Sequence, residues 1–176
     1  SIEIVRGPGS ALYGSNAVHG LINFISGPIA ENGTRLNSSA GSYGRYALTG
    51  QSSYVDDASA ARFSISLTGD EEGYRADSGF EQQKMRIETQ WRSGTTDYHF
   101  SLAGMNLNQE TAGYVKTEDC PSGQEAYEDE TCAKCNPFPE VYRYAEAVRS
   151  FLRMERSLSD GAALTVAPYL RSNDME

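Results

Sequence analysis

The sequence predicts an all-β fold of antiparallel strands, and three observations lead to this prediction. From residue 35 onward, polar and apolar side chains alternate in runs of about ten residues, which is the period of a strand with two unlike faces. Short groups of turn-forming residues separate these runs. No stretch of roughly 18 apolar residues occurs, so no membrane-spanning helix is expected. We therefore expect about seven strands in an open sheet.

The N-terminal stretch has a different pattern, in which two short apolar runs flank a turn of small residues. The first run, Ile2–Val5, stops at Gly7-Pro8-Gly9, because proline removes a ladder donor and glycine admits a positive φ. Ser10 can cap a single helical turn, which Gly14 ends. The run Val18–Ile25 is then extended again. This order predicts a strand, a turn and a second strand.

This stretch resembles the end of the plug domain of TonB-dependent outer-membrane receptors. Three positions depart from the pattern of that family, namely Gly9, His19 and Phe24, and none of them breaks the strand-turn-strand arrangement. A phosphate-binding loop is the weaker interpretation, since no Lys-Ser/Thr pair follows the glycines. An ordinary hairpin of a soluble β domain also stays open. The residues that carry the plug motif are Glu3, Arg6, Gly7, Pro8, Ser10, Leu12, Tyr13, Gly14, Gly20 and Asn23.

The resemblance implies both an organisation and a function. Residues 1–27 would end the plug, 28–34 would be a linker, and 35–176 would begin a transmembrane barrel of about 22 strands. Such receptors import a scarce, bulky solute, for example a ferric siderophore, haem, cobalamin or an oligosaccharide, with energy supplied through TonB. The implied partners are TonB, the solute and the lipid of the Gram-negative outer membrane. Arg6 would pair with carboxylates on the barrel wall.

Composition and motifs exclude other classes of protein. A net charge of −9 argues against a nucleic-acid partner, which needs a basic surface. His19 and His99 lie far apart, and no nucleophile elbow or metalloprotease motif occurs. We therefore expect no enzymatic activity, no catalytic residue, no metal and no cofactor. The chain opens in mid-motif and lacks a signal peptide, so we expect a fragment of a longer protein.

The barrel strands are expected at residues 35–41, 45–54, 61–69, 80–92 and 97–108. Alternation is clearest in the third of these, where Phe63, Ile65 and Leu67 oppose Arg62 and Ser64. In the fourth, the apolar face carries Met85, Ile87, Thr89 and Trp91, and in the fifth it carries Tyr98, Phe100 and Leu102. Short turns alternate with longer loops, as in barrels with tight periplasmic turns.

Magnitudes decide which face of these strands would meet lipid. Each Arg or Lys at the bilayer midplane costs roughly 2–4 kcal/mol. Three such residues, Arg62, Lys84 and Arg86, would together rival the whole stability of a domain, about 5–15 kcal/mol. In a barrel the apolar faces must therefore point outward. A soluble β-sandwich would show the same alternation with its apolar face inward, so periodicity alone leaves both open.

Residues 112–140 form the longest insertion and are predicted to be an outer loop. They contain all three cysteines, and a disulfide from Cys120 to either Cys132 or Cys135 suits an oxidising cell surface. The spacing of Cys132 and Cys135 also invites a zinc interpretation, but four ligands are needed and no histidine lies nearby. A loop of this length is usually functional or disordered. The candidate solute contacts are Tyr127, Phe138 and Tyr142.

The segment 141–158 is ambiguous in sequence. Tyr144, Val148, Phe151 and Leu152 follow the spacing of a helix, yet the preceding alternation favours a strand, and we expect a strand. A last strand is expected at 163–171, although Pro168 is awkward there because proline belongs at edges or bulges.

A second function of another class accounts for the same strands. A secreted or cell-surface β-domain that acts as an adhesin or binding module would also alternate polar and apolar residues. Solubility that depends on detergent would separate the two hypotheses.

Overall fold

The computed structural model describes residues 2–8, 19–24, 27–71, 73–120 and 130–176. The chain divides into two compact units, Ser1–Ala30 and Glu31–Glu176, which we describe separately. The boundary between them falls inside the segment predicted to be a linker.

The first unit contains a two-stranded antiparallel sheet. β1 (Ile2–Arg6) pairs with β2 (Gly20–Phe24), and Glu3 lies opposite Asn23 in this register. Beyond the last pair, the Gly7 amide donates to the carbonyl of His19 at 3.2 Å. The two strands of the predicted strand-turn-strand unit are thus present. The turn itself, with Ser10, Leu12, Tyr13 and Gly14, lies outside the described residues.

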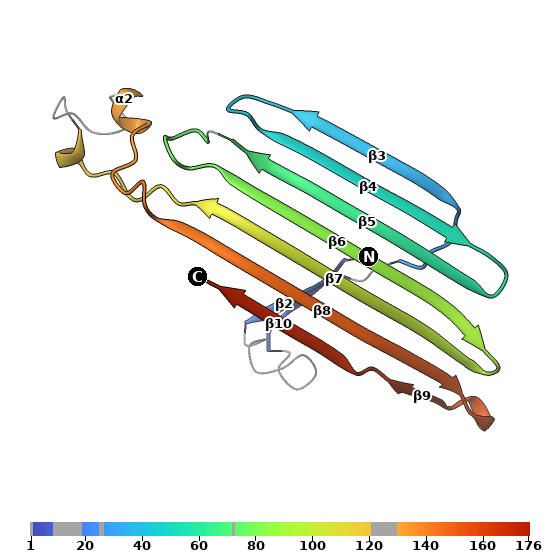
Figure 1. The fold of residues 1–176 in the computed structure, drawn as a ribbon. Helices are drawn as coiled ribbons and strands as arrows, with labels where there is room; N and C mark the ends of the chain where they lie inside the picture. Colours follow the sequence, from blue (N-terminus) through green and yellow to red (C-terminus); the bar gives the residue numbers. More distant parts are fainter. Residues whose placement is uncertain (1, 9–18, 25–26, 72, 121–129) are drawn as a thin grey trace. The chain divides into compact units, whose positions relative to one another are not determined.

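The second unit is one open antiparallel sheet (Figure 1). From one edge to the other the order is β10-β8-β7-β6-β5-β4-β3, and β9 pairs with β8 beside β10. This arrangement confirms the predicted all-β fold class. The strands are β3 (Gly33–Ala40), β4 (Tyr46–Val55), β5 (Ser59–Asp70), β6 (Phe80–Ser93), β7 (Thr96–Glu110), β8 (Tyr142–Ser157), β9 (Ala163–Val166) and β10 (Tyr169–Met175).

The ambiguous segment is a strand, as expected. β8 pairs with β7 from Thr96 opposite Arg156 to Glu110 opposite Tyr142. Its helical spacing therefore does not decide its structure, because β7 offers a continuous ladder of backbone partners. The only helices among the described residues are one α-helical turn and two 3₁₀ turns. None of them is long and apolar enough to cross a membrane.

The last predicted strand is interrupted at Pro168, the residue that the sequence marks as awkward there. β9 and β10 flank Ala167 and Pro168, so the sheet has eight strands where about seven were expected. The pairing with β8 keeps one register across the break, from Met154 opposite Val166 to Phe151 opposite Tyr169. Leu152 donates its amide to the Pro168 carbonyl at 3.0 Å. Proline interrupts the ladder without inserting a bulge.

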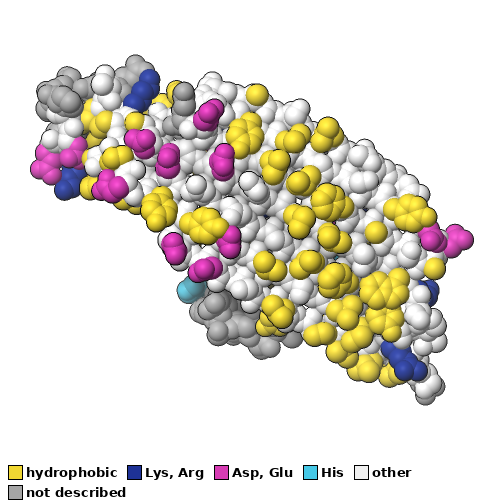
Figure 2. All heavy atoms as spheres, in the orientation of Figure 1, with side chains coloured by type: hydrophobic (Ala, Val, Ile, Leu, Met, Phe, Trp, Pro, Cys, Tyr) yellow, Lys and Arg dark blue, Asp and Glu magenta, His cyan; other side chains and the backbone are white. Residues whose placement is uncertain are grey.

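Register gives the sheet two unlike faces, because residues directly opposite each other in a ladder share a face. One such row runs through Phe63, Ile87 and Leu102 to Leu170. Many large apolar side chains of this apolar face are more than a third exposed (Figure 2). They include Leu36, Leu48, Tyr54, Phe63, Ile65, Met85, Ile87, Trp91, Val148, Leu164, Val166 and Leu170.

Little of the apolar surface is packed away. Among the described residues, the buried apolar side chains are Ile29, Ala60, Cys120, Cys132 and Ala145. A soluble sandwich would instead cover the apolar face with a second layer. The described sheet is therefore a single layer whose apolar face is uncovered.

Candidate functional site

The two ends of the sheet differ in the length of their connections. One end carries short turns at residues 56–58, 94–95 and 158–162. The other end carries the loops 41–45, 71–79 and 111–141, and Figure 1 shows α2 (Glu130–Ala133) within the longest of them. Since binding residues concentrate on loops held by a rigid scaffold, this loop end is the first candidate site.

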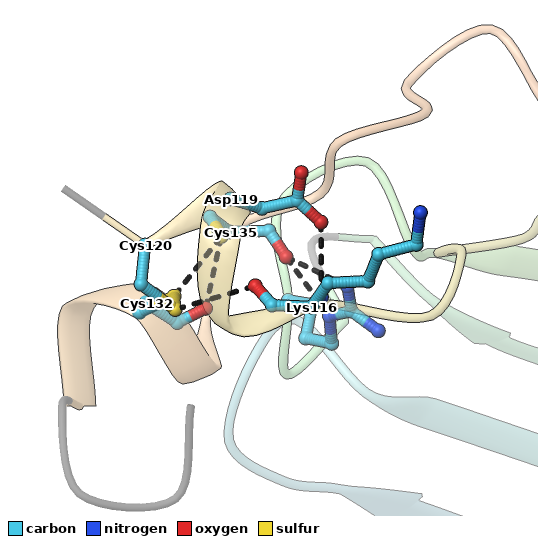
Figure 3. The surroundings of a disulfide bond; sticks show 6 residues. Lys116, Asp119, Cys120, Cys132 and Cys135 are labelled. Carbon is cyan, nitrogen blue, oxygen red and sulfur yellow. Dashed lines mark hydrogen bonds between the residues drawn. A yellow bond between two sulfur atoms is a disulfide. The ribbon is translucent and has the colours of Figure 1, made fainter. Parts of the chain in front are cut away.

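A disulfide cross-links the longest loop. Cys120, which follows the 3₁₀ turn η1 (Thr117–Asp119), bonds to Cys132 in α2 across a sequence separation of 12 (Figure 3). Both are buried, at 6% and 1% exposure, and Cys135 is a free thiol. This is one of the two pairings that the sequence left open. It also removes Cys132 as a zinc ligand, because zinc binds thiolates.

Arg75 joins the loop between β5 and β6 to the longest loop, between β7 and β8. From the loop between β5 and β6, its Nε and Nη2 donate to the Cys135 carbonyl at 3.0 and 2.8 Å. Its Nη1 donates to the Gly113 carbonyl at 2.7 Å. The guanidinium group, with donors in a fixed fork, thus satisfies two backbone acceptors far apart in the loop.

Further hydrogen bonds join the same two loops. The Ala76 amide donates to the Lys134 carbonyl at 2.9 Å, and the Asn136 side-chain amide donates to the Asp77 carbonyl at 2.9 Å. Because each bond satisfies a backbone carbonyl away from the sheet, the described parts of the two loops, residues 71, 73–79, 111–120 and 130–141, form one hydrogen-bonded structure at this end. We call them the docked loops.

The candidate solute contacts fall in different places. The ring of Phe138 lies over Gly113, where a Cβ would collide with it, and the side chain is 43% exposed. Tyr142 is 60% exposed but begins β8, and its register places it on the apolar face with Val148. Tyr127 lies outside the described residues. Tyr114, which the sequence analysis did not single out, is 82% exposed in the same loop.

The polar face of the sheet carries a buried carboxylate. Glu88 in β6 is 3% exposed, and Arg86 approaches it at 3.0 Å, Arg62 at 3.6 Å and His99 at 3.7 Å. Two arginines balance its charge, as a buried carboxylate requires. The alternation in the sequence placed Glu88 on this face, but the sequence analysis did not identify the cluster. Pairing Glu88 with Arg62 on the neighbouring strand would have predicted it.

Beside this cluster the polar face lines an open hollow of about 520 Å³. Its lining includes Arg35, Lys84, Arg86 and Arg149 and contains no carboxylate. Within the described residues, three of these cations, Arg35, Lys84 and Arg149, have no ion-pair partner, whereas Arg86 contacts Glu88. Unpaired cations in a hollow raise the local concentration of anions. The polar face is therefore suited to contact a negatively charged group.

The residues of the N-terminal motif are only partly described. Glu3 and Arg6 lie in β1, Gly7 and Pro8 follow it, and Gly20 and Asn23 lie in β2. A Cβ at Gly20 would lie 2.9 Å from the Val5 carbonyl oxygen, so the two strands approach closely at this position.

No family model matches the chain. In structure the chain is similar to the ferric-catecholate import receptor Fiu from E. coli K12 in an open form, with a TM-score of 0.81 and 17% sequence identity. The similarity covers 99% of this chain and 28% of that receptor chain. It shows that the open sheet has the fold of a segment of a β-barrel receptor.

Proposed function

We propose that this chain is part of a TonB-dependent receptor of the Gram-negative outer membrane, which imports a scarce, bulky solute. Residues 1–27 form the end of its plug, and residues 35–176 form part of its barrel wall. The solute is a ferric siderophore, haem, cobalamin or an oligosaccharide. The protein binds and transports it without catalysis, and the TonB complex supplies the energy.

The observation that carries this proposal is the sheet with an uncovered apolar face and a charged opposite face. In lipid, strands are stable only when all backbone groups are paired and the outward side chains are apolar. The apolar face meets the second requirement along its exposed Leu, Ile, Val and Met side chains. The ladders pair the backbone inside the sheet, and its two edge strands would pair with further strands of the barrel. Arg62, Lys84, Arg86 and Glu88 then face the lumen, away from lipid.

Two further observations support the proposal. The motif from Glu3 to Asn23 directly precedes the sheet, in the order that the resemblance to plug domains requires. The alternation of short turns and long loops fits a barrel with its short turns in the periplasm and its long loops outside. The docked loops then face the medium, where Phe138 contacts the arriving solute.

An uptake assay tests the transport function. Cells that express the complete receptor are given labelled ferric catecholate, ferric hydroxamate, haem, cobalamin or maltodextrin, with and without a protonophore. We expect accumulation of one of them that the protonophore abolishes. Gly14→Val is expected to bind that solute yet lose uptake, since a β-branched residue resists the positive φ that the sequence predicts at this position. Binding without energy-dependent uptake by the unmodified receptor would contradict the proposal.

Fluorescence quenching tests the orientation of the wall. Trp91 lies on the apolar face and its ring stacks on Tyr98, with centroids 5.0 Å apart. In a complete receptor in which Trp91 is the only tryptophan, brominated lipids should quench its emission, as tryptophan favours the membrane interface. If only a water-soluble quencher reaches Trp91, the apolar face does not meet lipid. An adhesin-like surface domain would also stay soluble without detergent.

A further inference from the structure

The three cysteines of the long loop lie close enough to react with one another. The Cys135 thiol lies 3.9 Å from Cys132 Sγ, which is bonded to Cys120. Cys135 is partly exposed, whereas the two bonded residues are buried. Disulfides exchange when a thiolate attacks one of their sulfur atoms, so contact between the thiol and its target is the first requirement.

The backbone holds the thiol in this position. The Cys135 amide donates to the Cys132 carbonyl at 3.1 Å, and the Cys135 thiol donates to the same oxygen at 2.9 Å. The two hydrogen bonds from Arg75 fix the Cys135 carbonyl from the other side. Cys135 is therefore anchored beside the disulfide through the docked loops.

We propose that Cys120, Cys132 and Cys135 form a thiol–disulfide exchange centre. The Cys135 thiol loses its proton to water, and the thiolate attacks Cys132 Sγ. The Cys132–Cys135 bond forms while the Cys120–Cys132 bond breaks, and the electron pair leaves on Cys120 Sγ, which takes up a proton. One disulfide and one thiol are present before and after, so no oxidant or reductant is needed.

The two isomers differ in what the disulfide constrains. In the first, the bond ties Cys120 to α2 across a separation of 12, and in the second it joins Cys132 to Cys135, three residues apart. A cross-link that closes a longer loop restricts the chain more. Exchange therefore releases the segment between Cys120 and Cys132 from its covalent closure. This inference does not rest on the transport function, because the covalent state can be measured without a solute.

Peptide mapping distinguishes the isomers because of where the lysines lie. Trypsin cuts after Lys116, Lys134 and Arg143, which places Cys120 and Cys132 in peptide 117–134 and Cys135 in peptide 135–143. The complete protein is incubated at neutral and at alkaline pH, quenched with acid, and its free thiol is alkylated before digestion. The first isomer gives two separate peptides with the label on Cys135. The second gives two joined peptides with the label on Cys120. Cleavage after Glu125, Glu128 and Glu130 then separates Cys120 from Cys132.

We expect the joined peptides labelled on Cys120 to increase with time and pH, at a rate that does not change on dilution. Cys135→Ser should lose them entirely and keep the Cys120–Cys132 bond. Cys120→Ser should contain the Cys132–Cys135 bond from the outset. The proposal is overturned if the label stays on Cys135 at every pH. It is equally overturned if the joined peptides carry the label on Cys132, if dilution slows their formation, or if Cys120→Ser has two free thiols.

Discussion

The two ends of this sheet are built by different means. At the short-turn end, each hairpin is closed within a few residues. At residues 94–95 Gly94 has a φ of +60°, and at residues 56–58 the Ala58 amide donates to the Asp56 carboxylate at 3.1 Å. At the loop end, side chains satisfy backbone groups that the strands leave behind, with Arg75 and Asn136 as the main donors. A disulfide adds a covalent tie. The same strands thus end in local turns on one side and in long-range contacts on the other.

This difference teaches where the chain can change without losing its fold. The sheet depends on ladders that run from β3 to β10 and needs only a short connection between β7 and β8. The docked loops add contacts that the sheet does not require. We therefore expect shortening of the longest loop to affect binding while the sheet still forms, and point changes at either end to alter stability according to the contacts that they remove or crowd.

The largest effect is expected from shortening the long loop. Replacing residues 115–140 with a Gly-Ser connection should leave insertion into the outer membrane normal, because loop closure depends weakly on length. Solute affinity should fall by more than tenfold, which corresponds to about 1.4 kcal/mol. Equilibrium binding to cells that express equal amounts of receptor measures this. An unchanged affinity would mean that the loop does not contact solute.

Removal of the Arg75 side chain should loosen the docked loops without removing them. Arg75→Ala deletes the three hydrogen bonds to Cys135 and Gly113. A single hydrogen bond from a charged donor contributes roughly 1.5–3 kcal/mol to stability. A loss of about 2 kcal/mol in local stability should speed hydrogen exchange in these loops roughly thirtyfold. Exchange of the β6–β7 amides serves as the internal control. Uniform acceleration across the sheet would instead indicate a global effect.

Alanine substitutions at two glycines with positive φ, one at each end of the sheet, allow a direct comparison of the two ends in stability. Gly94→Ala places a methyl group where nothing lies within 4 Å, so only backbone strain of about 1 kcal/mol is expected. Gly44→Ala, in the loop between β3 and β4, has a φ of +68° and would also bring its Cβ to 2.7 Å from the Glu71 Cβ. It should cost about 2 kcal/mol or more. Urea unfolding in detergent measures the loss of stability in both variants. Equal losses would mean that Glu71 moves aside at no energetic cost.

The smallest effect is expected for an exposed ion pair at the turn end. Arg92 donates to Asp97 at 2.6 and 2.9 Å, and both side chains are more than half exposed. Water screens such pairs, so Arg92→Ala should leave the unfolding midpoint unchanged within error. The same measurement on Gly44→Ala provides the contrast. A clear shift for Arg92→Ala would show that the turn end also relies on side chains.

The sequence predicted the sheet well because its signal is local. Adjacent residues such as Arg62 and Phe63, or Ile87 and Glu88, point to opposite faces, so the pattern can be read within a few residues. In the structure these side chains lie on the faces that the pattern predicted. Even the ambiguous segment from Tyr142 to Ser157 followed from the context of earlier strands. The sequence marked Pro168 as awkward, but whether the strand breaks or bulges there depends on how β8 pairs with the chain on both sides.

The candidate site was predicted less well because its contacts are distant in sequence. Arg75 bonds to carbonyls 38 and 60 residues away, and no pattern near Arg75 indicates them. The choice between Cys132 and Cys135 as partner of Cys120 depends on the fold of the loop and not on spacing. Tyr142 was assigned to the loop from its aromatic character, whereas the register of β8 governs where it lies.

The position of Pro168 has a consequence for how the sheet can grow. Because Leu152 donates to the Pro168 carbonyl, the backbone groups of residue 168 point toward β8, and those of Ala167 and Tyr169 point away from it. The backbone N–H that proline lacks would therefore have pointed toward β8, on the side of the strand that is already paired. From Ala163 to Asn173, the outer edge of β9 and β10 keeps a continuous row of donors and acceptors. An incoming strand finds there a complete template, which can set its register without a gap at the proline.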